Sequence, residues 1–576
     1  FWRWLFAVGV RSTVARCWAE EREVWATCRE PVWCGWRDAL VFAVFPVVLL
    51  ATGFALMQAR GPVWFFYRDP EYAYLFSSVH MLRGIAPLHT DHPGTLLQLL
   101  GALIMAVTDL GNWGQKTPVT ELLRHGERTL AAINGILLVL MALIAWASGM
   151  FGRWACRSFS AGLLLQAAWF ATPVSIAYLH RSTPELPLLM LAQLMGAVAV
   201  AMAERASLRR SLVLAVVLAV LCGLLIAMKV IALPLVVLLG AIAGSRRRMA
   251  ALALVPATFL VCTIPIWQHF AKTLSWLATV GQHTGYYGEG KVGVFDVAFS
   301  AGLFSEIVVR EWPFFAAVAI GLGALVGGLA KGLGKQCDGR ALLTIIALTS
   351  VASLGISLLT FKHPYARYLI PAVPLSGVAL VLSLGVWQRL GGQGTRIDLA
   401  SRFGVAALFL LFAFGAVSFR ASEMTRKEEF RTALAEREAF LKQQPNARVA
   451  AHINGPIEAG AFLFGRYFTD PGLKDPAYND AFGALFPGLL WAQHPKLVVA
   501  DAWGAPFQAW AEPSGPVTVN VVAFDSPSWD AVGLARLDGY EAKVVLLQPW
   551  GQVLALRPLE KTPAPMPPLP EAPKAD

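Results

Sequence analysis

Residues 211–240 read SLVLAVVLAVLCGLLIAMKVIALPLVVLLG, and Lys229 is the only charged residue among them. A bilayer has a hydrocarbon core of roughly 30 Å, which a long run of apolar residues can cross as a helix. The runs on the two sides of Lys229 therefore predict two membrane spans, near 211–228 and 231–244. Because only two residues separate them, we expect a helical hairpin with Lys229 at its turn.

Similar apolar windows recur through the first 420 residues. We expect eleven spans, near 39–58, 129–150, 159–178, 186–203, 211–228, 231–244, 249–267, 312–330, 341–360, 369–388 and 403–419. The whole chain of 576 residues is 56% hydrophobic and 15% charged, with a mean hydropathy of +0.55. Soluble domains hold about 25% charged residues. These values exclude a soluble enzyme and a disordered chain, and seven cysteines are too few for a disulfide scaffold. The sequence predicts an α-helical polytopic membrane protein.

The basic residues predict how the spans are oriented. Of the net charge of +11, the excess lies in residues 1–419, which hold 33 Lys/Arg and 19 Asp/Glu. Every second short loop carries a basic cluster: Arg153 and Arg157; Arg205, Arg209 and Arg210; Arg246, Arg247 and Arg248; Lys331, Lys335 and Arg340; Arg389, Arg396 and Arg402. Cytoplasmic loops retain such residues. The N-terminus is therefore expected in the cytoplasm and the segment after residue 419 outside.

Two further segments follow from this orientation. A span at 94–110 would move the basic residues of 1–38 to the wrong side, so we expect 94–110 to lie along or dip into the membrane surface. Residues 1–38, with six tryptophans among Arg and Glu, predict a cytoplasmic or interfacial helix. No cysteine falls in a predicted outer segment, which fits a bacterial inner membrane that faces an oxidising periplasm.

The remaining outer segments are long. The predicted transmembrane domain covers 39–420 and includes the outer loops 59–128 and 268–310. A charged helical stretch at 422–443 and several β-rich runs predict a soluble α/β periplasmic domain over 421–561. Its expected roles are acceptor recognition or a structural lid. The proline-rich residues 562–576 predict a disordered tail.

An acidic pair opens the first outer loop. Asp69 and Glu71 follow Arg68 and lie close to the end of the first span. A carboxylate at a membrane boundary can act as a general base when burial and a neighbouring arginine adjust its pKa. The alternative is an ordinary interfacial acidic loop. For Asp91, farther along the loop, a helix-capping role ahead of Pro93 is the preferred interpretation.

The predicted outer loops also hold isolated cations beside aromatic residues. They are Arg181, near Glu185; Lys229; and Lys362 and Arg367, near His363 and Tyr365. Cations at the hydrocarbon edge suit a phosphate whose lipid tail stays in the membrane. Lys229 and Lys362 could instead be interfacial anchors. The glycine-flanked Tyr286 and Tyr287 in 268–310 suggest a mobile flap, or otherwise a plain surface loop.

Together these motifs resemble the GT-C glycosyltransferases, a group that includes protein O-mannosyltransferases and the aminoarabinose transferase that modifies lipid A. The resemblance covers 39–420 in layout. It implies that Asp69 is the catalytic base, with Glu71 as partner or substitute. The mannosyltransferases carry adjacent acids, whereas Pro70 separates these two, which leaves open which acid takes the proton. The implied phosphate-binding residues are Lys229, Arg367, Arg181 and Lys362, and the implied substrate-binding residues are Tyr72, His92, Glu185, His363, Tyr365, Tyr286 and Tyr287.

The function expected from this resemblance is inverting transfer of a sugar from a polyprenyl phosphate to a hydroxyl of an envelope lipid, glycan or protein. No nucleic acid partner and no required cofactor are expected. His89, Asp91 and His92 could bind a divalent metal by residue type, but a metal is not expected to be required. One alternative is a secondary transporter, although transporters usually place ionisable residues in the middle of the membrane. The other is an inactive relative that binds lipid or glycan.

Overall fold

The computed structural model describes most of the chain. The described residues are 35–66, 68–90, 94–108, 118–285, 288, 290–391, 394–443, 449–452, 458–470, 475–486, 490–493, 498–501, 517–521, 540–548 and 551–558. They divide into two compact units, one within Phe1–Val63 and Tyr67–Lys427 and the other within Trp64–Phe66 and Glu428–Asp576. Most of the predicted N-terminal helix and the predicted tail 562–576 lie outside the described residues.

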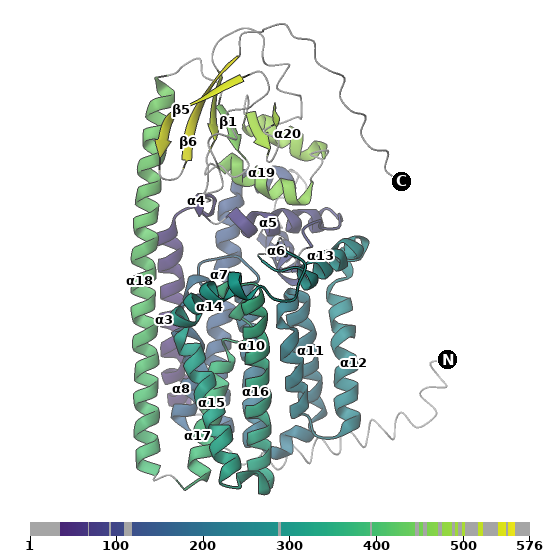
Figure 1. The fold of residues 1–576 in the computed structure, drawn as a ribbon, viewed down its shortest axis with the longest axis vertical. Helices are drawn as coiled ribbons and strands as arrows, with labels where there is room; N and C mark the ends of the chain where they lie inside the picture. Colours follow the sequence, from purple (N-terminus) through teal and green to yellow (C-terminus); the bar gives the residue numbers. More distant parts are fainter. Residues whose placement is uncertain are drawn as a thin grey trace, which may run out of the picture. The chain divides into compact units, whose positions relative to one another are not determined.

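The first unit is helical (Figure 1). Its α-helices are α3 (Trp36–Arg60), α5 (Arg68–Leu82), α6 (Thr95–Thr108), α7 (Pro118–Cys156), α8 (Phe159–Ala167), α9 (Pro173–Ala177), α10 (Glu185–Glu204), α11 (Leu212–Met228), α12 (Ser245–Cys262), α13 (Phe270–Gln282), α14 (Val297–Arg310), α15 (Trp312–Ala330), α16 (Cys337–Lys362), α17 (Leu375–Arg389) and the first part of α18 (Gly394–Lys442). Short 3₁₀ segments connect them: η1 (Ala168–Ala171), η2 (Ala206–Arg210), η3 (Val230–Ala241), η4 (Ile264–His269), η6 (Leu333–Lys335) and η7 (Ala366–Leu369).

Six of the described helices are long and apolar enough to cross a membrane, so the chain is a polytopic membrane protein. A bent pair, Ser245–Cys262 and Ile264–Gln282, would make a seventh. The predicted windows at 159–178, 211–228, 231–244 and 369–388 form shorter apolar helices instead, and the total of eleven spans stays a prediction. Prolines account for part of the difference, because Pro173 follows η1 and Pro234 lies inside η3.

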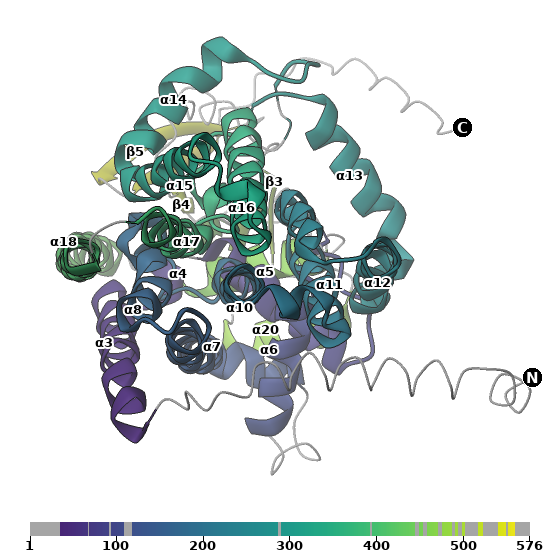
Figure 2. The same ribbon diagram turned by 90° about the horizontal axis from the view of Figure 1, so that it is seen from below.

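Helix α10 lies at the centre of the first unit. Viewed from below, α7, α8, α17, α16 and α11 surround it (Figure 2). It packs against α7, α11, α17 and α16, and 89% of its apolar window is buried inside the protein. A helix that is apolar all round belongs in such a position. Its first residue, Glu185, is therefore held at the end of the best-packed element.

The predicted hairpin at 211–240 is present as α11 and η3. The Ser211 side chain caps α11, and Lys229 ends it in an extended conformation, with φ −162° and ψ 121°. At the other end the Ala243 N–H donates to the Arg209 carbonyl at 2.7 Å, which closes the hairpin. The two segments differ in residue number but have nearly the same length, because a 3₁₀ helix rises more per residue. At about 2.0 Å per residue, η3 spans roughly 24 Å, and at about 1.5 Å per residue, α11 spans roughly 25 Å.

Helix α6 occupies most of the predicted surface segment 94–110. Its 14 residues span only about 21 Å, too short for a typical bilayer. In Figure 1, α5 and α13 run across the direction of α10, α11 and α16 rather than along it. These transverse helices carry or adjoin the residues of the candidate site. Where α6 lies relative to the membrane stays a prediction.

The second unit contains α4 (Val63–Phe66) in part, α19 (Glu458–Thr469), α20 (Pro476–Leu485) and a six-stranded sheet in the order β3-β2-β1-β4-β6-β5. The strands are β1 (Val449–His452), β2 (Leu490–Gln493), β3 (Val498–Asp501), β4 (Val517–Val521), β5 (Tyr540–Gln548) and β6 (Gly551–Pro558). Strand β1 pairs in parallel with β2 and β4, and the other pairs are antiparallel. That residues 421–561 form a soluble periplasmic domain stays a prediction.

The packing of α3, α7 and α8 gives a stability prediction. A Cβ atom at Gly162 would lie 2.6 Å from the Gly149 carbonyl oxygen and 2.7 Å from Phe42 Cζ. We therefore expect Gly162→Val to lower the free energy of unfolding by about 1–3 kcal/mol through overpacking. Thermal unfolding of the purified protein in detergent measures this. Gly323→Val in α15 is the control, because a Cβ atom there meets nothing within 4 Å. Equal losses of stability in both variants would contradict the close packing of α8 against α3 and α7.

Candidate functional site

Five charged residues from distant segments converge near the turn of the α11–η3 hairpin. We call Glu71, Arg181, Glu185, Lys229 and Arg367 the charge cluster. They come from α5, the turn after α9, the start of α10, the turn of the hairpin and η7. The Tyr178 phenol interacts electrostatically with four of them, Glu185, Arg181, Arg367 and Glu71. All five were predicted as site residues, and the structure brings them together; their roles stay predictions.

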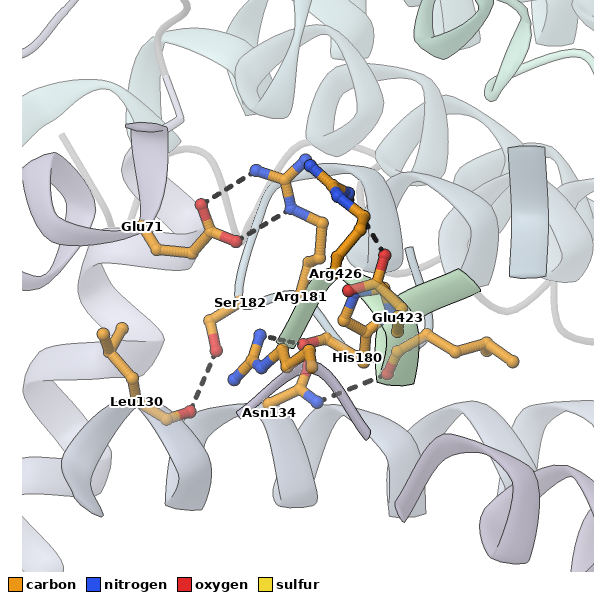
Figure 3. Close-up of polar contacts among 10 residues, drawn as sticks. Glu71, Leu130, Asn134, His180, Arg181, Ser182, Glu423 and Arg426 are labelled. Atoms are coloured by element: carbon orange, nitrogen blue, oxygen red, sulfur yellow. Dashed lines mark hydrogen bonds and ion pairs between the residues drawn. The ribbon is translucent and has the colours of Figure 1, made fainter. Parts of the chain in front are cut away.

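The first half of the cluster is a bidentate ion pair. Arg181 Nε donates to Glu71 Oε1 at 2.8 Å and Arg181 Nη2 donates to Oε2 at 3.0 Å, as Figure 3 shows. The Glu71 side chain is completely buried. Burial raises the pKa of the Glu71 carboxyl, and the charges of Arg181 and Arg60 oppose that rise. The two parallel hydrogen bonds fix the planes of both groups. They anchor α5 to the loop that precedes α10.

That loop is itself held from several sides. Arg60, the last residue of α3, donates from Nη1 to the His180 carbonyl. Ser182 Oγ donates to the Leu130 carbonyl at 2.9 Å, and Asn134 Nδ2 donates to the Leu179 carbonyl at 3.3 Å (Figure 3). Burial lowers the pKa of His180 well below its usual value, and Arg60, Arg181 and Arg426 lower it further. His180 is therefore neutral at neutral pH and adds no charge next to the charge cluster.

The second half of the cluster is a deeply buried ion pair. Lys229 Nζ donates to Glu185 Oε1 at 2.8 Å, and the two side chains are 3% and 2% exposed. Lys229 Nζ also lies 5.1 Å from the centre of the Tyr368 ring. Glu185 is at the first residue of α10, where the helix dipole favours a negative charge. The Gly94 N–H donates to the Met228 carbonyl at 3.3 Å, so the start of α6 adjoins this corner.

Arg367 completes the cluster from η7. Its guanidinium carbon lies 5.0 Å from the centre of the Tyr365 ring and 5.9 Å from that of Tyr368. It also interacts electrostatically with Glu185 and Lys229. Burial raises the pKa of Tyr368 to about 12, so this phenol stays protonated and can donate a hydrogen bond. The aromatic faces hold Arg367 beside the Glu185–Lys229 pair.

Two predicted residues contact the end of α13 and the segment that follows it. Lys362 Nζ donates to the Gly281 carbonyl, and His363 Nδ1 is 2.7 Å from the Gly285 carbonyl. Burial lowers the pKa of His363. Lys362 therefore contacts the last turn of α13 and His363 contacts the segment after it, next to the predicted flap residues. Tyr286 and Tyr287 themselves lie outside the described residues, so the flap stays a prediction.

Tyr72 and Glu127 form a link that the sequence did not predict. Tyr72 Oη donates to Glu127 Oε1 at 2.6 Å, and the Val63 N–H donates to Glu127 Oε2 at 2.8 Å. Glu127 thus holds both ends of residues 63–72, the segment that contains Asp69. Its position at the very end of the predicted outer loop 59–128 was the only available signal. Arg60 and Tyr178 were also not predicted, and Tyr368, although part of the basic and aromatic motif at 362–368, was given no role.

The remaining predicted site residues, or their side chains, lie outside the part of the chain that the structure describes. The backbone of Asp69 belongs to α5, but its side chain lies outside the described residues, as do His92 and Asp91. In the part of the chain that the structure describes, no group of three or more His, Cys, Asp and Glu side chains could hold a metal ion. Because Asp91 and His92 lie outside that part, the metal question stays a prediction.

The Glu185–Lys229 pair gives a prediction that does not depend on activity. Removing one partner of a buried ion pair leaves an uncompensated charge, so Lys229→Met should cost about 3–5 kcal/mol of unfolding free energy. The double variant Glu185→Leu/Lys229→Met should regain much of that loss. Thermal unfolding of all four proteins of the cycle measures the coupling. Arg402→Met is the control, since Arg402 and Asp398 form an exposed pair with 72% and 53% exposure; such pairs contribute about 0–1 kcal/mol. A Lys229→Met loss no larger than the control's would contradict the buried pair.

The chain was compared with known families, proteins and structures. No protein-family model matches it, and no curated protein is similar to it in sequence. The crystal structure of ArnT from Cupriavidus metallidurans bound to undecaprenyl phosphate is similar to it, with a TM-score of 0.46 and 14% identity, over 91% of this chain and 98% of that one. The apo state of the same protein gives a TM-score of 0.44, with the same identity and coverage.

Proposed function

We propose that the chain is an integral membrane glycosyltransferase that moves a sugar from a polyprenyl-phosphate donor to a hydroxyl group of an envelope acceptor. The buried charge cluster is the observation that carries this proposal. It gathers Arg181, Lys229 and Arg367 from three segments of a protein whose apolar windows hold few charges. A ligand with an anionic head and a long apolar tail fits cations that lie at the ends of apolar helices.

The charges of the cluster favour an anionic ligand. In the described part of the site, the cluster has three cations and two carboxylates, and Arg60 adds positive charge near Glu71. A polyprenyl-phosphate sugar is a phosphodiester with one negative charge. Its phosphate would offset the excess while Lys229 and Arg367 stabilise the charge that develops as it leaves. Cations that are fixed in place before the reaction need little reorganisation.

The Glu71–Arg181 pair supports Asp69 as the general base. Both Glu71 oxygens accept hydrogen bonds from Arg181, so Glu71 is better suited to hold Arg181 than to accept a proton. In the proposed step the Asp69 carboxylate takes the proton of the acceptor hydroxyl. The hydroxyl oxygen forms a bond to the anomeric carbon as the bond from that carbon to the phosphate oxygen breaks, with inversion. Polyprenyl phosphate leaves, and no metal is needed.

The site is proposed to face the periplasm of a bacterial inner membrane, with the N-terminus in the cytoplasm. Lipid, glycan and protein acceptors all remain within the proposal. Residues 421–561 are proposed as a periplasmic domain that recognises the acceptor or covers the site. The basic clusters of the predicted cytoplasmic loops support this orientation.

Replacement of the proposed base tests the reaction. We expect Asp69→Asn to lower sugar transfer about 100- to 10,000-fold, the usual contribution of general-base catalysis. Glu71→Gln should give a smaller loss, because Arg181 keeps part of its contact. Mass spectrometry of lipopolysaccharide, envelope glycans and glycoproteins from cells with each variant measures transfer. Asp398→Asn, an exposed position, is the control and should match the wild type.

Binding of undecaprenyl phosphate to the purified protein separates donor recognition from chemistry. Asp69→Asn should bind this lipid as the wild type does, whereas Arg367→Ala should bind it more weakly. Normal glycosylation by a stably folded Asp69→Asn variant would show that the proposed base is wrong. Flux of a labelled solute that depends on this protein would favour a transporter instead.

A further inference from the structure

A second group of cations lies at the opposite end of the α11–η3 hairpin from Lys229. Arg209 of η2 donates from Nε to the Ala241 carbonyl at 2.8 Å. Arg248 of α12 donates from Nη2 to the Ile242 carbonyl at 3.0 Å. The two acceptors are consecutive carbonyls at the end of η3. Two guanidinium groups from different segments are therefore fixed side by side, each with further N–H groups for another acceptor.

The arrangement places like charges next to each other. Burial lowers the pKa of Arg209, and the charge of Arg248 lowers it further, although the guanidinium remains protonated. Across the residues that the structure describes, neither arginine forms an ion pair with a carboxylate. Two adjacent positive charges repel, and an anion between them would remove that cost.

A helix start adds to the positive potential. Cys337, the first residue of α16, is close enough to interact electrostatically with Arg209, and α16 packs against both η2 and η3. The beginning of a long helix carries partial positive charge and N–H groups that lack partners within the helix. Asp338, the acid of that first turn, interacts electrostatically with Arg389. Two guanidinium groups and a helix start therefore share one corner.

Apolar side chains border this corner. Leu212 and Val213, at the start of α11, are 38% and 44% exposed, and Met249 in α12 is 64% exposed. The pair thus lies where a charged surface meets the apolar surface of a membrane protein. This is the depth of lipid headgroups, and a ligand there would have a phosphate at one end and hydrocarbon at the other.

We propose that Arg209 and Arg248 form a binding site for the phosphate of an anionic phospholipid, with its acyl chains along Leu212, Val213 and Met249. The site is separate from the charge cluster, because the length of α11, about 25 Å, lies between Arg209 and Lys229. The bound lipid would bridge η2 and α12 at the end of the hairpin that the hydrogen bond from the Ala243 N–H to the Arg209 carbonyl closes. The proposal does not depend on the proposed function.

Lipid binding to the purified full-length protein tests this site. Phosphatidylglycerol should bind to the delipidated wild type and raise its thermal midpoint, as followed by native mass spectrometry and thermal unfolding. Arg209→Gln/Arg248→Gln should bind it about 10- to 30-fold more weakly, since each basic residue near the membrane surface contributes a factor of about five. The charge-matched control is Arg37→Gln/Arg402→Gln, two exposed arginines at the starts of α3 and α18, away from this corner, and it should bind as the wild type does.

Each other outcome counts against the site. Equal loss in the control would mean diffuse charge attraction, and equal binding of phosphatidylcholine would exclude recognition of the anionic headgroup. Stabilisation by inorganic phosphate as large as that by phosphatidylglycerol would assign the site to a free anion. If the double glutamine variant does not fold, Arg209→Lys/Arg248→Lys keeps the charges and removes the forked geometry. Unchanged lipid binding by that variant would overturn the proposal.

Discussion

The buried ion pair between Glu185 and Lys229 is the constraint on which the first unit depends. A lysine enclosed among apolar helices is costly without a partner, and Glu185 supplies one at 2.8 Å. Glu185 begins α10, the central helix, and Lys229 turns the α11–η3 hairpin. The pair therefore joins the centre of the unit to its hairpin. It also sets where Tyr368 and Arg367 approach, because both interact with one or the other partner.

Sequence periodicity and hydropathy predicted the helices that depend on local pattern alone. Windows at 39–58, 186–203 and 312–330 correspond to α3, α10 and α15, and the turn at Lys229 was expected because a single charge interrupts two apolar runs. The 3₁₀ form of 230–241 was not predictable, since it depends on Pro234 and on packing against α16. The 76° bend after Cys262 lies next to Pro265 at the start of η4, although the window at 249–267 was predicted as one span.

The sequence predicted which residues belong to the candidate site, but not which of them contact each other. Arg181, Lys229 and Arg367 stood out because basic residues are scarce in the short predicted outer loops. Nothing in the sequence shows that Glu71 lies against Arg181, because the two are 110 residues apart and meet only when α5 contacts the loop that precedes α10. Glu127 was missed for the same reason. Its carboxylate matters through contacts with Tyr72 and Val63, and contacts of that kind are set by the tertiary fold.

The α11–η3 hairpin also constrains the membrane around it. Both of its segments are about 25 Å long, and cations mark both ends: Lys229 at one and Arg209 with Arg248 at the other. A typical bilayer has about 30 Å of hydrocarbon. If the hairpin crosses the bilayer, as the sequence predicts, this mismatch is met by local thinning of the bilayer or by side chains that reach outward. Where the bilayer thins, the two phosphate layers approach each other. The length of the hairpin would then set the local thickness of the membrane.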